Sequence, residues 1–149
     1  MIDSQLVSIL QDIVRRENRS LLQYIHDSFP WTPADEQPML AQLRQFAEEE
    51  REAAAKLGRW LARIRIIVPN LGAYPAAFTT INYVSLDHVL PKVATDEREG
   101  LAMLEQDLAA IHDQDARSLV AALVDMKRQH LKSVEELAAA HPLTVDNRP

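Results

Sequence analysis

Four stretches of this chain carry apolar residues at the alternating spacing of three and four that lines one face of an α-helix, and an ionisable residue interrupts each stripe. The stripes run over residues 6–24, 39–67, 90–111 and 116–137. In chain order, the interrupting residues are Glu17, Glu50, Glu97 and the pair Lys127 and His130. A polar group that faces a core costs a few kcal/mol unless a partner satisfies it. One such residue on each helix therefore predicts that these side chains meet inside the protein.

The composition favours an all-α fold built as one domain. The chain has 149 residues, of which 47% are hydrophobic, and this is enough for a single domain with a core. It contains only three glycines but many alanine, leucine, glutamate, glutamine and arginine residues, which favour long helices over sheets with their turns. We therefore expect one helical domain over residues 1–149.

Charge, cysteine content and hydropathy exclude several classes of function. Twenty-two acidic and sixteen basic side chains give a net charge of −6, which repels the phosphate backbone of nucleic acids. Without cysteine the chain can form neither a disulfide nor a thiolate metal site, and it has no Gly-x-Ser-x-Gly motif or glycine-rich phosphate loop. Its longest apolar run is too short to span a bilayer, and its N-terminus lacks a signal-peptide pattern. We expect a cytoplasmic protein that binds neither nucleic acid nor membrane.

Caps and prolines predict four helices, at about residues 4–28, 33–68, 86–112 and 116–140, with a crossover over residues 69–84. Asp3 or Ser4 can cap the first helix, and the stretch from Thr32 to Asp35 has the spacing of a capping box before the second. Pro91 predicts a kink or an irregular start in the third helix, because proline cannot donate a backbone hydrogen bond.

The crossover is long enough to pass from one end of a helical bundle to the other. Its residues, fully extended, reach roughly 53 Å at about 3.3 Å each, and a helix of about 33 residues is roughly 50 Å long. Short, long and short connections then describe two antiparallel helix hairpins joined end to end, a topology found in ferritin-like bundles. Three aromatic residues of this segment, Tyr74, Phe78 and Tyr83, are expected to pin it to the bundle.

The register of the interrupting residues resembles that of the ferritin-like superfamily, which includes bacterioferritin and rubrerythrin, over about residues 4–140. The di-iron pattern of that superfamily is Glu on the first helix, Glu-x-x-His on the second, Glu on the third and Glu-x-x-His on the fourth. The positions that match are Glu17, Glu50, Glu97 and His130. Ala53 stands where the second motif has its histidine, and Lys127 stands where the fourth has its glutamate. Tyr24 matches the tyrosine that many ferritins place beside their metals, which implies a hydrogen-bond donor next to the ligands.

The two missing ligands predict a degenerate di-iron site. Three carboxylates and one imidazole offset too little of the charge of two irons, about four units, so the dioxygen chemistry of working di-iron enzymes is not supported. We expect one of two states. Either Glu17, Glu50, Glu97 and His130 bind a single divalent metal weakly, as iron, manganese or zinc, or the polar core is free of metal and the Lys127 ammonium replaces the cation.

Several alternatives remain open for these residues. Asp96 and Glu99 compete with Glu97 for the place in the polar layer, and Lys127 can instead extend its four-carbon stem to solvent. The remaining histidines fall near predicted helix ends and add nothing to a metal site: His26, His88, His112 and His141.

A reading from a different class is a non-catalytic helical module that binds a protein partner or a second copy of itself. Apolar residues outside the stripes are its contact candidates, namely Trp31, Phe78 and Val84. This alternative predicts a homo-oligomer, with a dimer favoured.

Overall fold

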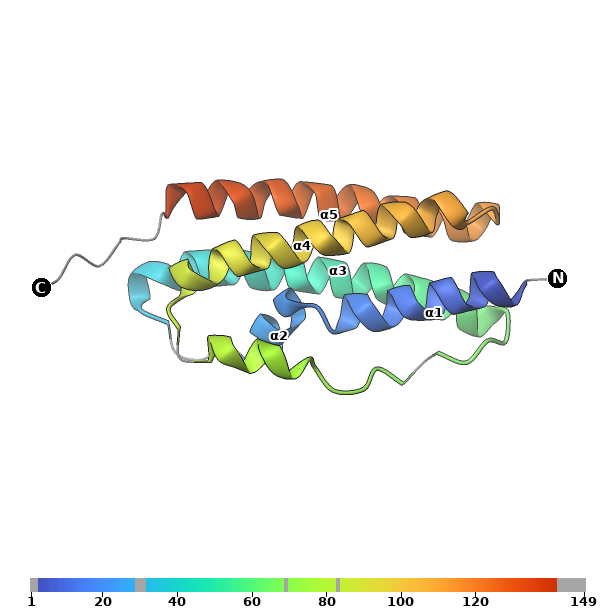
Figure 1. Cartoon of the computed structure of the whole chain (residues 1–149), viewed down its shortest axis with the longest axis horizontal. Coiled ribbons are helices and arrows are strands. Elements are labelled where there is room, and N and C mark those ends of the chain that lie inside the picture. The colour runs from blue at the N-terminus through green and yellow to red at the C-terminus, as the bar shows by residue number, and fades with distance from the viewer. Residues whose placement is uncertain (1–2, 29–31, 69, 83, 142–149) are drawn as a thin grey trace, which may run out of the picture.

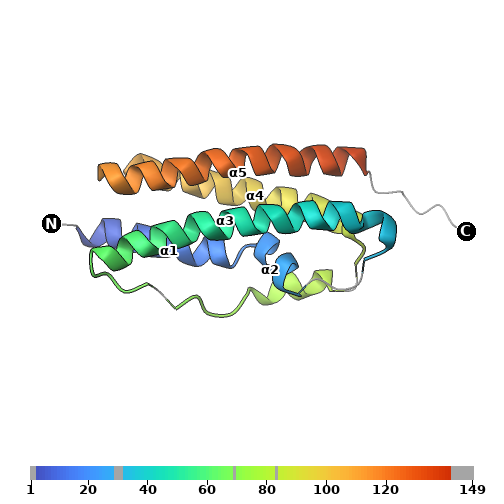
Figure 2. The same ribbon diagram turned by 180° about the vertical axis from the view of Figure 1, so that it is seen from behind.

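The computed structural model describes residues 3–28, 32–68, 70–82 and 84–141. Within these ranges the chain is all-helical and has no β-strand, as the composition predicted. Its α-helices are α1 (Ser4–Asn18), α2 (Leu21–Ser28), α3 (Gln37–Arg63), α4 (Leu86–Ala110) and α5 (Gln114–Ala140), and its short 3-10 helices are η1 (Ala34–Glu36) and η2 (Ala76–Ile81). Helices α1, α3, α4 and α5 lie along the long axis of the molecule, α2 is inclined to it, and the connection between α3 and α4 passes from one end to the other (Figures 1 and 2).

The first predicted helix is divided into α1 and α2. Asp3 caps α1 by accepting a hydrogen bond from the Leu6 amide at 2.9 Å. The helix then ends at Asn18, and a new one begins after Ser20, whose hydroxyl accepts from the Gln23 amide at 3.2 Å. The prediction of one helix over residues 4–28 was therefore wrong at this point.

The second helix is shorter at both ends than the sequence predicted. Its first turn is the 3-10 helix η1, and the Thr32 hydroxyl is buried without a hydrogen-bond partner, so the expected capping box does not form. At its C-terminal end Arg65 has a φ of 65°, which lets the Ile66 amide donate to the Leu61 carbonyl at 2.9 Å and stops the helix. A glycine normally takes this position, so an arginine there did not indicate that the helix ends.

Helices α4 and α5 run in opposite directions and pack against each other along their length (Figure 1). Asp113 caps α5 by accepting from the Ala116 amide at 3.0 Å. Helix α4 is α-helical from Leu86 onward and contains Pro91. It therefore does not have the irregular start that was one of the two expectations for this proline.

Aromatic residues hold the connection between α3 and α4 against the bundle. This confirms the prediction for Tyr74 and Phe78. The Tyr74 hydroxyl donates to Asp27 at 2.7 Å, and the Tyr74 ring meets the Tyr24 ring edge to face at 5.3 Å between centroids. Phe78 packs against the apolar core cluster that contains the buried residues of α2. Tyr83 lies outside the described residues.

The core consists of two apolar clusters at different levels of the bundle. One contains residues from α2, the first part of α3, the first part of α4 and the end of α5. The other contains residues from α1, the last part of α3, the last part of α4 and the first part of α5. On each of these helical paths, the ionisable residue that interrupts the stripe lies between the residues of the two clusters.

None of the helices in the described ranges combines the length and the apolar character that a membrane crossing requires.

Candidate functional site

The interrupting residues of all four stripes are buried and meet between the two apolar clusters. Their relative exposures are 2% for Glu17, 0% for Glu50 and Glu97, 2% for Lys127 and 4% for His130. Helix α1 supplies Glu17, α3 supplies Glu50, α4 supplies Glu97, and α5 supplies both cationic residues. The prediction that these side chains are buried and meet is therefore confirmed, and among the three acidic residues that the sequence left open on the third helix, Glu97 is the one in the layer.

Lys127 lies at the centre of this layer. Its Nζ atom is 2.8 Å from Glu17 Oε2, 2.9 Å from Glu50 Oε1 and 3.5 Å from Glu97 Oε1. The side chain does not extend to solvent, so one of the alternatives left open by the sequence is excluded. An ammonium has three N–H donors and three carboxylates surround it here, so its charge is shared among three helices besides its own.

His130 joins the layer to the surface. Its Nδ1 atom is 2.7 Å from Glu50 Oε2, and its Nε2 atom is 2.8 Å from Oε2 of Glu49, whose side chain is 40% exposed. The ring also stacks on Phe46, with 4.5 Å between the centroids. With a carboxylate on each nitrogen, the imidazole can donate two hydrogen bonds only when it is protonated. Glu49 had no assigned role in the stripe pattern, because it lies one position away from the buried face.

The electrostatics of the layer divide the three buried carboxyl groups. Burial would raise the pKa of Glu50, but the Lys127 charge and the His130 hydrogen bond outweigh it and lower the pKa to about 2. Burial raises the pKa of Glu97 well above its usual value, against the attraction of Lys127 and with repulsion from Glu50 adding to the effect. The pKa of Glu17 is raised for the same first reason. The contacts of Glu50 therefore lower its pKa, whereas burial moves the pKa values of Glu97 and Glu17 in the opposite direction.

The two cations are held in their charged forms. Burial would lower the pKa of Lys127, but Glu17, Glu97 and Glu50 raise it well above its usual value. For His130, the hydrogen bonds with Glu50 and Glu49 outweigh burial and raise the pKa.

Tyr24 does not adjoin this layer as the resemblance implied. Its hydroxyl donates to Asn82 Oδ1 at 2.6 Å, and its ring packs against Tyr74 and Phe78 of the connection. The break after Asn18 changes the register between Glu17 and Tyr24, so the two no longer share one helical face. The signal for this break was present as Ser20-x-x-Gln23, the spacing of a capping box inside the predicted helix.

The four remaining histidines do not take part in the layer. His88, His112 and His141 are exposed, and His26 contacts Asp27 and Glu48 near the surface. This agrees with their positions near predicted helix ends.

The residues that could hold a metal are those around Lys127. Their side chains include suitable ligand atoms for one ion, but the lysine competes for those atoms. Glu50, Glu97 and His130 each offer a ligand atom, and these atoms lie within 4.8 Å of one another. The Lys127 ammonium contacts the Glu50 and Glu97 oxygens that such an ion would use. Two cations at this separation repel strongly in a buried site, so a divalent ion must displace the ammonium first. The donor set does not fit a pair of metal ions, because Ala53 and Lys127 remove two of the ligands.

The contact residues proposed for an interaction module are mostly covered. Phe78 and Val84 are partly buried and pack against the core, so they are not the exposed contacts that we expected. Trp31 lies outside the described residues. The large apolar side chains that are exposed include Val68, Met103 and Ile67. The sequence analysis placed Ile67 at the end of the second buried stripe, which was wrong because α3 already ends at Arg63.

The chain matches no known family model and no curated protein sequence.

Proposed function

We propose that the protein is a ferritin-like helical bundle that performs no di-iron chemistry, because its own lysine closes the carboxylate centre. The observation that carries this proposal is the position of Lys127 Nζ, within 2.8 to 3.5 Å of carboxylate oxygens from Glu17, Glu50 and Glu97. Carboxylates that face one another repel and take up protons unless a cation lies between them. The ammonium supplies that cation from within the chain, so the bundle is complete without a metal.

The ferritin-like part of the proposal is supported by two features. The long connection passes from the end of α3 to the start of α4 at the other end of the molecule (Figure 1). The carboxylates also come from one position on each of three helical paths, with lysine and histidine three residues apart on the fourth. Both features belong to the pattern from which the resemblance was drawn.

Binding of a single divalent ion is the weaker version of this proposal. The oxygens of Glu50 and Glu97 and a nitrogen of His130 are suitable donors for iron, manganese or zinc. Such an ion would compete with Lys127 for the oxygens and with a proton for the imidazole, and both competitors are held tightly. Any binding is therefore expected to be weak and to strengthen when the lysine is removed.

Metal titration tests the proposal with a matched pair of variants. Wild-type protein, purified without chelators, is titrated with Fe(II), Mn(II) and Zn(II) by calorimetry, and its metal content is measured by elemental analysis. Lys127→Glu restores the carboxylate of the di-iron pattern, whereas Lys132→Glu makes the same charge change at an exposed position of the same helix. We expect less than one bound ion per wild-type chain, the same result for Lys132→Glu, and a gain of at least about tenfold in affinity for Lys127→Glu, since the competing charge becomes a ligand.

Two results would contradict the proposal. Binding of two or more irons per wild-type chain would show that the centre is not degenerate. An affinity of Lys127→Glu equal to that of Lys132→Glu, with both variants folded by circular dichroism, would show that Lys127 does not keep metal out. Light scattering of the same samples tests the separate prediction of a homodimer.

A further inference from the structure

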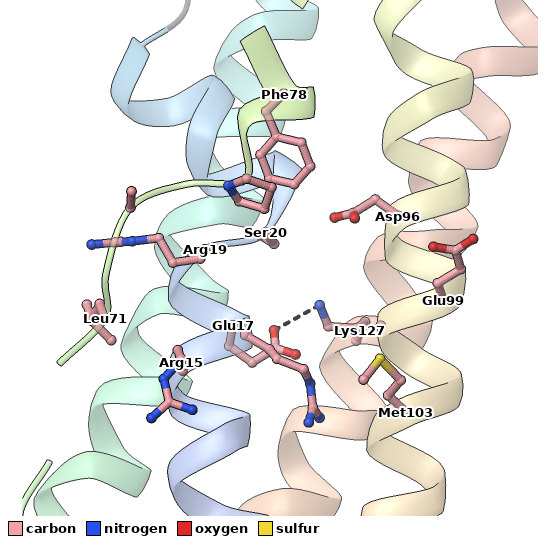
Figure 3. Close-up of a pocket in the computed structure, with 14 residues that line it drawn as sticks. Arg15, Glu17, Arg19, Ser20, Leu71, Phe78, Asp96, Glu99, Met103 and Lys127 are labelled. Carbon is pink, nitrogen blue, oxygen red and sulfur yellow. Dashed lines mark ion pairs between the residues drawn. The ribbon is translucent and has the colours of Figure 1, made fainter. Parts of the chain in front are cut away.

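A cavity of about 340 Å³ lies between α1, α4 and the connection that precedes η2, and it reaches down to Lys127 (Figure 3). This volume is at the lower end of the range for small-molecule sites in proteins. Lys127 and Glu17 form its floor, and the missing side chain of Gly100 leaves the approach to the amine open, since a Cβ there would lie 3.5 Å from Nζ. The cavity therefore connects the buried layer with the outside on the side of α1 and α4.

The walls of the cavity are largely apolar. Leu71, Ala73 and Pro75 contribute from the connection, Phe78 comes from η2, and Met103 comes from α4. Met103 is 45% exposed although it is a large apolar residue, which leaves the rim of the cavity unprotected. Walls of this kind suit the carbon skeleton of an organic ligand and do not suit a hydrated ion.

The basic residues of the cavity already have partners. Arg15 pairs with Asp12 at 2.8 Å and Arg16 pairs with Asp107 at 2.6 Å. Arg19 donates to the Gly72 carbonyl at 2.8 Å and lies 4.7 Å above the centre of a tyrosine ring. In Figure 3, Arg15 and Arg19 point away from the space between α1 and α4. An anionic ligand would find little free positive charge inside.

Unlike Arg15 and Arg16, one acidic side chain at the cavity has no oppositely charged partner within the described part of the chain. The Asp96 carboxylate points into the space between the helices (Figure 3), and it accepts a hydrogen bond from the Leu21 amide at 3.0 Å. Among the described residues it has no ion pair within 4.0 Å. Glu17, 2% exposed on the floor, pairs through its Oε2 atom with the Lys127 ammonium at 2.8 Å. Asp96 therefore combines two properties: its carboxylate points into the cavity, and it has no ion-pair partner among the described residues.

We propose that this cavity binds a small primary amine with an apolar body, whose ammonium group pairs with Asp96 while the body lies against Phe78 and Met103. The ligand's ammonium provides the positive charge that Asp96 lacks, and the carbon skeleton covers the apolar walls. Burial raises the pKa of Asp96, and the hydrogen bond from the Leu21 amide and the Lys127 charge offset this only in part. A ligand site at this cavity goes beyond the proposed function, because it does not require the centre to be free of metal.

A set of three probes with one carbon skeleton tests the proposal on the wild-type protein. Phenethylamine carries an ammonium, 2-phenylethanol carries a neutral hydroxyl, and phenylacetate carries an anion of similar length. Each is titrated by calorimetry and by 1H–15N NMR at neutral pH. We expect the amine to bind at least about tenfold more tightly than the other two, since a hydrogen-bonded charge pair distinguishes it, and to shift the amides of Ser20, Phe78 and Gly100.

Variants on α4 locate the contact. Asp96→Asn keeps an oxygen that accepts from Leu21 but removes the charge, whereas Glu105→Gln removes an exposed charge of the same helix that pairs with Arg128 outside the cavity. Asp96→Asn is expected to bind the amine about tenfold more weakly, and Glu105→Gln is expected to match the wild type.

Several outcomes would overturn the proposal. These are equal binding of the amine and the alcohol, unchanged binding by Asp96→Asn, amide shifts that fall outside the cavity, and no binding of the amine up to about 10 mM. The comparison of probes and the Asp96→Asn variant both leave Lys127 unchanged. A negative result in either therefore has no bearing on the metal titration of Lys127→Glu, and failure of this proposal can be distinguished from failure of the proposed function.

Discussion

At the scale of single residues, Lys127 determines how the interior of this protein tolerates its charges. Three carboxyl groups lie within 3.5 Å of its amine, and none of the five ionisable residues of the layer is more than 4% exposed. Removing one partner of a buried ion pair leaves the other charge without compensation, which costs more than the pair itself contributes. Lys127 therefore serves as the common partner of Glu17, Glu50 and Glu97.

Replacing Lys127 by methionine is expected to destabilise the protein strongly. Methionine has a similar length and fills the same space, so the variant mainly removes the charge. We expect the free energy of unfolding at neutral pH to fall by about 3 to 5 kcal/mol, the range found when one partner of a buried pair is lost. Urea unfolding followed by circular dichroism measures the change.

The same substitution at Lys132 is the control, because that residue is exposed on the same helix. Lys132→Met is expected to change the stability by no more than about 0.5 kcal/mol. The loss in Lys127→Met should also shrink toward pH 4, where the carboxyl groups that face the missing amine can take up protons. Equal stability of the two variants at neutral pH would contradict the role of Lys127 as the internal cation.

At the scale of helices, the sequence predicted the faces better than the ends. The stripes correctly placed Glu17, Glu50 and Glu97 inside, because burial of an apolar face follows the helical period closely. The helix ends depend on single hydrogen bonds and on backbone angles such as the positive φ of Arg65, which carry little sequence signal. The prediction that Tyr24 lies beside the layer failed because the end of α1 at Asn18 was not predicted. The break there changes the helical register of the residues that follow, including Tyr24.

The start of α2 is the element that can be tested most simply. Ser20 accepts a hydrogen bond from the Gln23 amide, and its replacement by alanine removes this cap. We expect Ser20→Ala to lower the free energy of unfolding by about 1 kcal/mol, the usual value for loss of an N-cap side chain. Urea unfolding gives the difference directly.

Ser118→Ala provides the comparison, since Ser118 is exposed within α5. Alanine is the better helix former there, so this variant should be as stable as the wild type or slightly more stable. If residues 4–28 formed one continuous helix, Ser20→Ala would also be neutral or stabilising, and the break between α1 and α2 would be disproved.

At the scale of the whole molecule, the ionisable layer divides the core and opens to the surface on two sides. On one side His130 contacts the half-exposed Glu49, and on the other the cavity between α1 and α4 reaches Lys127 and Glu17. The sequence predicted the layer but not these openings. Glu49 lies outside the stripe, and the cavity depends on how closely α1 packs against α4, which no periodicity within a single helix can report.

The pKa shifts of the layer predict how the stability of the whole protein depends on pH. The pKa of Glu50 is lowered from 4.5 to about 2, so its contribution is present above pH 4.5 and is lost as the pH falls toward 2. The pKa of His130 is raised above 6.5, so its contribution is complete below pH 6.5 and is lost as the pH rises through the raised value. Glu97, also raised, acts in the same direction as His130 from pH 4.5 upward. We expect the free energy of unfolding to be highest near about pH 4.5 and to decline above it.

Urea unfolding at about pH 3, 5.5 and 8 measures this profile, and Glu97→Gln isolates one part of it. Because the pKa of Glu97 is raised, the folded protein binds this proton more tightly than the unfolded chain does, and this difference weakens the folded state as the pH rises above 4.5. The amide of the variant is neutral at every pH, so its stability should decline less between pH 5.5 and 8 than that of the wild type. A wild-type stability that stays constant or rises over this interval, or an identical decline in both proteins, would mean that Glu97 is ionised beside Lys127 and that the layer carries a net negative charge.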